Sequence, residues 1–212
     1  MNEAANIFGS HHMLIKVCGM REEQNISDLE KLDIDWMGMI FWSGSKRYVS
    51  RPPSRLPQRV KKVGVFVDAS LDDIRQHVSD YQLDIIQLHG HETPAFLETL
   101  KPLTLIKAFN IADASDLEKT KAYEGIADYF LFDTKGKIVG GNGEKFDWTV
   151  LTAYEGATPF LLSGGIGPDD VQKVKQFHHQ KCIGIDLNSR FESAPGLKDI
   201  DQLQTFIKQI RL

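Results

Sequence analysis

The chain contains 212 residues, of which 42% are hydrophobic and 25% are charged, and its formal net charge is −4 at pH 7. This length and composition are typical of one globular domain with a sizeable core. The negative charge gives no general electrostatic reason to expect nucleic acid or an anionic membrane as a partner. The sequence also lacks an apolar run of roughly 18 residues, the length that predicts a membrane span.

The two cysteines, Cys18 and Cys182, lie far apart in the sequence. They are too few for a disulfide framework, and neither belongs to a CxxC metal-binding pair. We therefore expect a reduced, cytoplasmic protein without a metal site. Residues 1–12 lack the basic and apolar regions of a secretory signal. We expect them to be a disordered, dispensable extension of a single domain formed by residues 13–212.

Short runs of β-type residues alternate with amphipathic segments along the chain. The predicted strands cover residues 14–18, 36–41, 63–67, 84–88, 104–109, 128–132, 159–162 and 182–185. The predicted helices cover residues 22–33, 52–61, 70–80, 92–101, 113–124, 147–155, 168–177 and 199–210. The strands are short and apolar, as is typical of buried parallel strands. Eight strands, each followed by a helix, predict an α/β fold, and the count of eight favours a closed (βα)8 TIM barrel over an open sheet.

In such a barrel the active site lies where the strands end and the following loops begin. Polar segments follow most of the predicted strands, namely Cys18-Gly19, 43–48, Asp68, His89-Gly90, 133–135, 163–165 and 186–189. Because the carboxyl ends of all the strands open on one face of the barrel, we expect these segments to lie around one site.

Glycine-bearing polar loops follow the last three predicted strands. They contain Gly141 and Gly143, then Ser163, Gly164 and Gly165, then Asp186, Asn188 and Ser189. Glycine lets backbone N–H groups approach an anion closely, and barrels often bind phosphate with the loops after strands 7 and 8. The loops therefore predict a phosphate site, although tight turns alone would also use glycine. With Asp186 nearby, we expect backbone groups and hydroxyls to hold most of the phosphate.

Nine short motifs extend this pattern over nearly the whole chain from Ile15 onward. They are KVCGM (16–20), SKRYV (45–49), VGVFVD (63–68), IQLHGHE (86–92), LFDTK (131–135), GGNGEKFDW (140–148), LLSGGIGPDD (161–170), GIDLNSRFE (184–192) and PGLKD (195–199). Each motif is weak alone, but all nine in this order, at barrel spacing, resemble the phosphoribosylanthranilate isomerase family.

The resemblance implies an Amadori rearrangement of N-(5-phosphoribosyl)anthranilate in tryptophan biosynthesis, without a metal or an organic cofactor. It implies that Cys18 is the base that removes the sugar C2′ proton and that Asp133 is the acid that protonates the furanose ring oxygen. Arg47 matches the residue that binds the anthranilate carboxylate, for which a guanidinium fork is suited. His89 matches a supporting, substrate-binding position. The implied partner is a small phosphorylated substrate, and the protein is expected to be a monomer or a homodimer.

The proposed acid and base both need unusual ionisation, because a free thiol is mostly protonated at neutral pH and a free aspartate is mostly ionised. Strand alternation places Lys16 on the same face as Cys18, and we hypothesise that Lys16 or Lys107 supplies positive potential inside the barrel. Without the motifs, Cys18 could equally be a small buried hydrophobe and Asp133 a loop-capping residue. Cys182 begins a strand, at the end of the barrel away from the expected site.

Two other functions remain open. A histidine-pathway isomerase performs the same chemistry on a related barrel, but that family uses a carboxylate after strand 1, where this chain has Cys18. A non-catalytic phosphosugar-binding barrel is the second alternative, although Cys18 and Asp133 are both present. One departure from the family concerns Arg190, which stands where many members have a small residue. It could reach the phosphate or the substrate carboxylate, or point into solvent.

Overall fold

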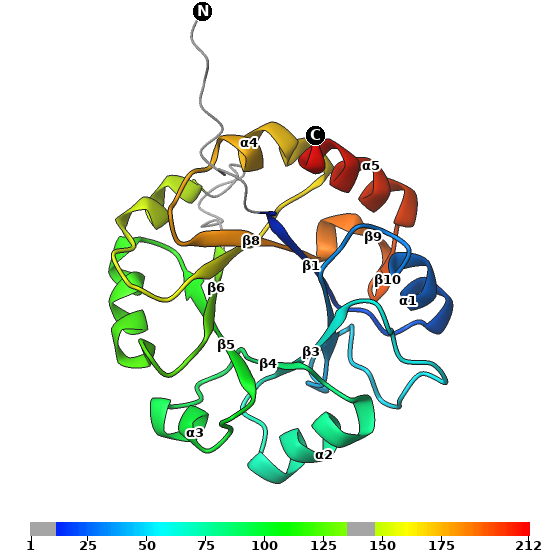
Figure 1. The fold of residues 1–212 in the computed structure, drawn as a ribbon, viewed down its shortest axis with the longest axis horizontal. Coiled ribbons are helices and arrows are strands. Elements are labelled where there is room, and N and C mark those ends of the chain that lie inside the picture. Colours follow the sequence, from blue (N-terminus) through cyan, green and yellow to red (C-terminus); the bar gives the residue numbers. More distant parts are fainter. Residues whose placement is uncertain (1–11, 135–146) are drawn as a thin grey trace, which may run out of the picture.

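Eight parallel strands close into a barrel in the computed structural model, which describes residues 12–134 and 147–212. In chain order they are β1 (Leu14–Cys18), β2 (Trp36–Ile40), β3 (Lys61–Phe66), β4 (Ile85–Leu88), β5 (Thr104–Ile111), β6 (Tyr129–Thr134), β7 (Phe160–Ser163) and β8 (Cys182–Leu187). Figure 1 shows the strands as a central ring with helices around it. The predicted (βα)8 barrel is confirmed, and every predicted strand overlaps an observed one.

The outer layer consists of α-helices and 3-10 helices. They are α1 (Glu23–Leu29), α2 (Leu71–Tyr81), α3 (Pro94–Glu98), η1 (Ala114–Tyr123), η2 (Trp148–Ala153), η3 (Pro168–Asp170), α4 (Val171–Gln176) and α5 (Ile200–Arg211). Several begin at capping side chains that accept a hydrogen bond from the first turn, as Ser70 does for α2 and Thr93 for α3. In the part of the chain that the structure describes, no helix is long and apolar enough to cross a membrane.

The helix predicted over residues 52–61 is wrong, because this connection between β2 and β3 consists of turns and bends. Pro52, Pro53 and Pro57 account for the difference. Proline has no backbone N–H to donate within a helix, and it disfavours helical backbone angles in the residue before it. The chain therefore crosses from β2 to β3 without an α-helix.

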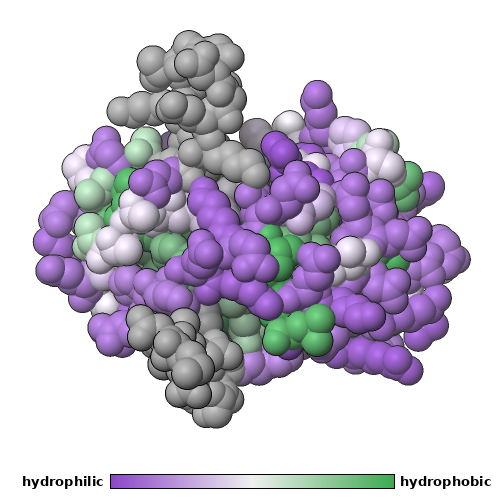
Figure 2. Space-filling model, turned by 90° about the horizontal axis from the view of Figure 1, so that it is seen from above, coloured by the Kyte–Doolittle hydropathy of each residue, from purple (hydrophilic) through white to green (hydrophobic). Residues whose placement is uncertain are grey.

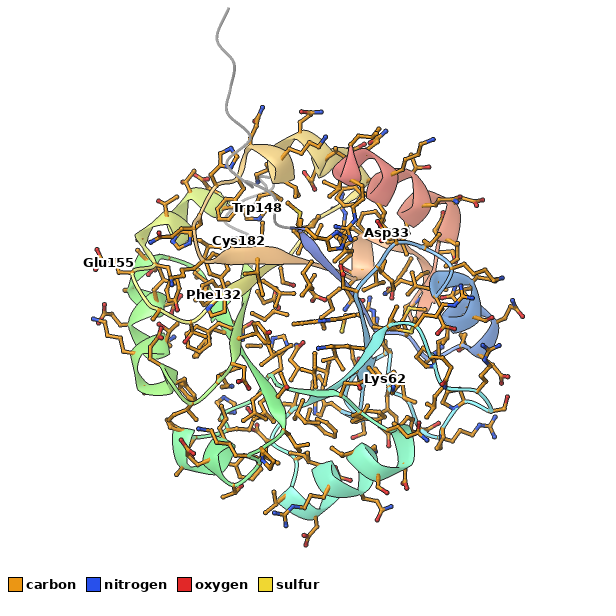
Figure 3. All side chains as sticks on the ribbon, in the orientation of Figure 1. Asp33, Lys62, Phe132, Trp148, Glu155 and Cys182 are labelled. Carbon is orange, nitrogen blue, oxygen red and sulfur yellow. The ribbon has the colours of Figure 1, made fainter. Side chains whose placement is uncertain are left out.

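Strand alternation divides the apolar side chains into two sets. One set fills the inside of the ring and includes Trp36, Val63, Ile85, Ile106, Ala108, Leu131 and Leu161. The larger set, to which Phe132 belongs, packs between the strands and the helices. Figure 3 shows side chains filling both spaces. The face of the molecule seen in Figure 2 is mainly hydrophilic, with small hydrophobic areas.

A small excursion follows β8 that the sequence patterns did not predict. It consists of a 3-10 turn, η4 (Ser189–Phe191), and a two-stranded antiparallel hairpin of β9 (Glu192–Ala194) and β10 (Leu197–Lys198). Both side-chain amide atoms of Asn25 on α1 bind the backbone of Lys198, at 2.7 and 2.9 Å. This contact holds the hairpin against the barrel close to the end of β1.

Candidate active site

A cavity opens at the carboxyl ends of the strands. Its described lining consists of Cys18, Ile40, Val65, Gln87, His89, Asp133, Ser163, Gly164, Gly165, Ile166, Asp186, Asn188, Ser189 and Arg190. The structure therefore brings together most of the predicted site residues, which come from strands and loops all around the barrel. Gly141 and Gly143 lie outside the described residues, so their predicted role stays a prediction.

Cys18 ends β1 and is buried, with 4% of its surface exposed. It is in register with Gly38 on β2. A methyl group on Gly38 would lie 2.7 Å from the Cys18 Sγ and 3.1 Å from its Cα. Because no side chain fits there, Gly38 provides the space that the thiol occupies. The sequence patterns did not single out this glycine, since its role depends on the pairing of β1 with β2.

Buried charge surrounds the thiol. Lys16 is fully buried, and its Nζ donates to Asp186 Oδ1 at 2.8 Å. Burial raises the pKa of Cys18 above its ordinary value, while Lys16 lowers it by a smaller amount. The positive charge of Lys16 therefore acts on the Cys18 pKa in the expected direction, but burial makes the net shift of that pKa upward. Burial alone would lower the pKa of Lys16; Asp186 and Cys18 raise it overall, so Lys16 remains protonated at neutral pH.

Asp133, on β6, faces the imidazole of His89. The distance from His89 Nε2 to Asp133 Oδ2 is 3.7 Å. Burial lowers the pKa of His89, although Asp133 opposes this effect, so the imidazole is neutral at pH 7. A neutral imidazole adds no full positive charge beside the Asp133 carboxyl.

Gln87 lies behind His89 and was not among the predicted site residues. It is only 2% exposed, and its Nε2 lies 3.4 Å from His89 Nδ1. Its Oε1 is buried and has no hydrogen-bond partner within the described residues. The motif around His89 contains Gln87, but only strand alternation in the closed barrel turns its side chain toward the cavity.

The predicted phosphate loops meet on one side of the cavity. Ser163, at the end of β7, donates from Oγ to Asp186 Oδ2 at 3.1 Å. Gly164 and Gly165 follow it with φ angles of 94° and 68°, in the left-handed region that favours glycine. Asn188 and Ser189 come from the loop after β8. The two adjacent loops therefore lie on one side of the cavity, and their role in binding phosphate stays a prediction.

Arg47 lies beside the start of the loop after β1. A methyl group on Gly19, whose φ is 84°, would lie 2.6 Å from the Arg47 Cδ. The guanidinium Nε and Nη2 donate to Glu192, with Nη2 at 2.6 Å from Oε2. Glu192 also accepts from the buried Lys198 Nζ at 2.6 Å. The hairpin after β8 thus holds Arg47 in a defined orientation next to Cys18.

The Lys107 side chain does not lie inside the barrel, although its positive charge helps to lower the pKa of His89. Its neighbours on β5, Ile106 and Ala108, face inward, and the alternation turns Lys107 to the outer layer. There its Nζ donates to Glu92 Oε2 at 3.0 Å and to the carbonyl of Gly90 at 2.8 Å.

Neither the second cysteine, Cys182, nor the described carboxylates form a second candidate site. Cys182 begins β8 at the opposite end of the barrel, where burial raises the pKa of its thiol to about 12. Within residues 12–134 and 147–212, no group of three or more His, Cys, Asp or Glu side chains is arranged to hold a metal ion.

Comparison with known proteins identifies relatives of the whole barrel. Residues 15–209 match the family model described as N-(5'phosphoribosyl)anthranilate (PRA) isomerase. An N-(5'-phosphoribosyl)anthranilate isomerase of Parabacteroides distasonis is 52% identical over 206 residues, covering 93% of each chain.

Solved structures agree with this assignment. The phosphoribosyl anthranilate isomerase of Thermotoga maritima superposes with a TM-score of 0.84 at 30% identity, covering 94% of this chain and 99% of that one. A phosphoribosyl anthranilate isomerase in complex with reduced 1-(o-carboxyphenylamino)-1-deoxyribulose 5-phosphate has a TM-score of 0.82 at 29% identity, with the same coverage. The chain therefore belongs to the N-(5'-phosphoribosyl)anthranilate isomerase family.

Proposed function

We propose that this chain catalyses the Amadori rearrangement of N-(5'-phosphoribosyl)anthranilate to 1-(2-carboxyphenylamino)-1-deoxyribulose 5-phosphate in tryptophan biosynthesis. The observation that carries the proposal is that Cys18 and Asp133 line the same cavity. Their strands, β1 and β6, are separated in the barrel by β7 and β8. An acid and a base can therefore act on one substrate from different sides.

In the proposed reaction, Asp133 donates a proton to the furanose ring oxygen, and the C1′–O bond breaks to give an open-chain iminium ion. Cys18, as the thiolate, then removes the proton from C2′. The electron pair of that C–H bond neutralises the iminium nitrogen, which leaves an enolamine that tautomerises to the ketone. Each group transfers one proton, and no electrons leave the substrate, so an acid and a base are sufficient.

The raised pKa of Cys18 has two opposite consequences. A smaller fraction of the thiol is ionised at neutral pH, but the thiolate that does form is a stronger base toward a carbon acid. Lys16 limits the first effect, because its positive charge stabilises the thiolate. We therefore expect Lys16 to increase the fraction of Cys18 that is ionised at neutral pH.

The two charged ends of the substrate fit different parts of the site. Ser163, Gly164, Gly165 and the loop after β8 would bind the phosphate, as in many barrels. Arg47 would bind the anthranilate carboxylate through Nη1, the guanidinium nitrogen that does not contact Glu192 in the described structure. Because Glu192 fixes the plane of the guanidinium, we expect Arg47→Lys to raise KM more than it lowers kcat.

The test is a coupled assay of rearrangement on freshly made phosphoribosylanthranilate. Cys18→Ser and Asp133→Asn should each lower activity by at least about a hundredfold, as expected for a lost general base or acid. Cys182→Ser and Asp169→Asn are matched controls, because Cys182 is remote and Asp169 is exposed, and both should stay active. The proposal would be contradicted if folded wild-type protein did not convert phosphoribosylanthranilate but did convert the substrate of the histidine-pathway isomerase, which carries two phosphates.

Three further predictions accompany the function. We expect the protein in the cytoplasm, and we expect it to be a monomer or a homodimer. Residues 1–11 lie outside the described structure, so the proposal that the first twelve residues are a dispensable extension also stays a prediction. Removal of residues 1–12 should leave kcat and KM unchanged.

A further inference from the structure

Arg190 lies where the two predicted phosphate loops meet. It belongs to η4, directly after Ser189, and it lines the cavity together with Gly164 and Gly165. A methyl group on Gly167 would lie 3.3 Å from the Arg190 Nε and 3.5 Å from its Cβ. The Arg190 side chain, from Cβ to Nε, therefore lies alongside the loop after β7.

Among the described residues, the other cations near the site are already paired. Lys16 binds Asp186, while Arg47 and Lys198 share Glu192. Arg190 forms no ion pair with any residue in the described part of the chain. It is also the only lysine or arginine among the described residues that line the cavity.

The charge of the cavity lining makes this arginine significant. The described lining contains two carboxylates, Asp133 and Asp186, against one guanidinium. A phosphate monoester carries a charge between −1 and −2 near neutral pH, roughly −1.5 to −2 at pH 7. Neutral hydroxyl and backbone donors can orient such an anion, but they do not balance its charge. A guanidinium supplies both a positive charge and a planar fork of donors that fits two phosphate oxygens.

We infer that Arg190 is a phosphate-binding residue of this chain and that its guanidinium closes on the sugar phosphate held by the loops after β7 and β8. This inference rests on the proposed function for the identity of the sugar phosphate, but it does not require catalysis for its test. The sequence left three possibilities open for Arg190: it could bind the phosphate, bind the substrate carboxylate or point into solvent. The inference selects the first of these.

The first experiment measures the binding of inorganic phosphate and, separately, of anthranilate to the intact protein by isothermal titration calorimetry. Arg190→Gln should weaken phosphate binding about tenfold or more, the size expected for a charge-assisted hydrogen bond, and leave anthranilate binding unchanged. Arg190→Lys should retain part of the affinity, because it keeps the charge and loses the fork. Arg75→Gln, an exposed arginine on α2, is the matched control and should bind phosphate like wild type.

The second experiment separates kcat from KM on phosphoribosylanthranilate. Arg190→Gln should raise KM about tenfold or more with kcat within about threefold, because the arginine contacts the phosphate in both the ground state and the transition state. Phosphate binding that depends on Arg190 in a protein without isomerase activity would support the inference and contradict the proposed function.

Three results would overturn the inference. The first is equal phosphate binding by Arg190→Gln and wild type, which would place the side chain in solvent. The second is a loss of anthranilate binding in place of phosphate binding, which would assign Arg190 to the carboxylate. The third is wild-type protein that binds no inorganic phosphate at millimolar concentration. Because Arg190 is exposed, the variants are expected to fold, and circular dichroism checks this directly.

Discussion

Breaking the ion pair between Lys107 and Glu92 should be among the most destabilising single changes in the barrel. Both side chains are almost completely buried, with 3% and 2% of their surfaces exposed. Glu92 accepts from Lys107 Nζ at 3.0 Å, from the backbone N–H of Asp68 at 2.9 Å and from that of Gly90 at 3.0 Å. The pair therefore joins the loops after β3 and β4 to β5.

Glu92→Gln removes the negative charge while keeping the shape, so the buried Lys107 ammonium loses its counter-charge. Removing one partner of a buried ion pair costs about 3–5 kcal/mol of unfolding free energy. For a domain of this size, such a loss lowers Tm by roughly 6–20 °C. The Lys107 Nζ also donates to the carbonyls of Leu88 and Gly90, on either side of His89. We therefore expect the same variant to lower kcat, since the loop that carries His89 loses its support.

The assay is equilibrium unfolding in urea, followed by far-ultraviolet circular dichroism at pH 7. The double variant Lys107→Met, Glu92→Gln should lose less than the sum of the two single variants, because it leaves no unpaired buried charge. Lys121→Met is the control, since Lys121 pairs with Glu118 on the surface, where both are mostly exposed, and such pairs contribute little. A loss below about 1 kcal/mol for Glu92→Gln would refute this account of the pair.

Three other perturbations test the site. Since burial raises the pKa of Cys18 above the ordinary 9.0, kcat/KM should rise with pH across the neutral range. Lys16→Met should move that rise to higher pH. An unchanged pH profile in this variant would show that Lys16 does not act on Cys18. Gly38→Ala should lower kcat about tenfold or more with the fold retained, because the new methyl group competes with the Cys18 thiol for space, and wild-type kcat in this variant would contradict the packing. The pKa of Glu192 is lowered in the folded state, because Arg47 and Lys198 outweigh burial. Its contribution to stability is therefore present above the ordinary 4.5 and lost as pH falls through the lower folded value, so Glu192→Gln should flatten the acid side of the urea-midpoint profile between pH 3 and 6.

The barrel could be predicted because its strands are buried on both sides and read as continuous apolar runs. The regular spacing of eight such runs leaves few other ways to bury them. The same regular repeat of strand and helix led to a wrong prediction at residues 52–61, because it implied a helix between every two successive strands. The prolines at 52, 53 and 57 carried the contrary signal, and they should have outweighed the expected repeat.

The candidate site could be predicted where a chemically reactive side chain stands at the end of a strand or directly after it. Cys18, His89, Asp133 and Ser163 stand at or just after strand ends in the sequence, and the closed barrel brings them to one cavity. Lys107 shows the limit of this reasoning. Lys107 lies within a strand, and the sequence alone does not show which side of the barrel wall its side chain faces. Ile106 and Ala108 face the interior, so Lys107, one residue away from each, faces the outer layer.

Local sequence patterns were enough to predict the fold class, the end of the barrel where the candidate site lies, and the residues that end its strands. These follow from local patterns, namely apolar runs, their spacing and the polar residues after them. The folded structure was needed to show which residues are neighbours across strands, as with Gly38 against the Cys18 thiol and Glu192 between Arg47 and Lys198. The physical reason is that strand register, burial and ion pairing are set by contacts between distant segments, and the free energy of a buried charge depends on those contacts and not on its neighbours in the chain.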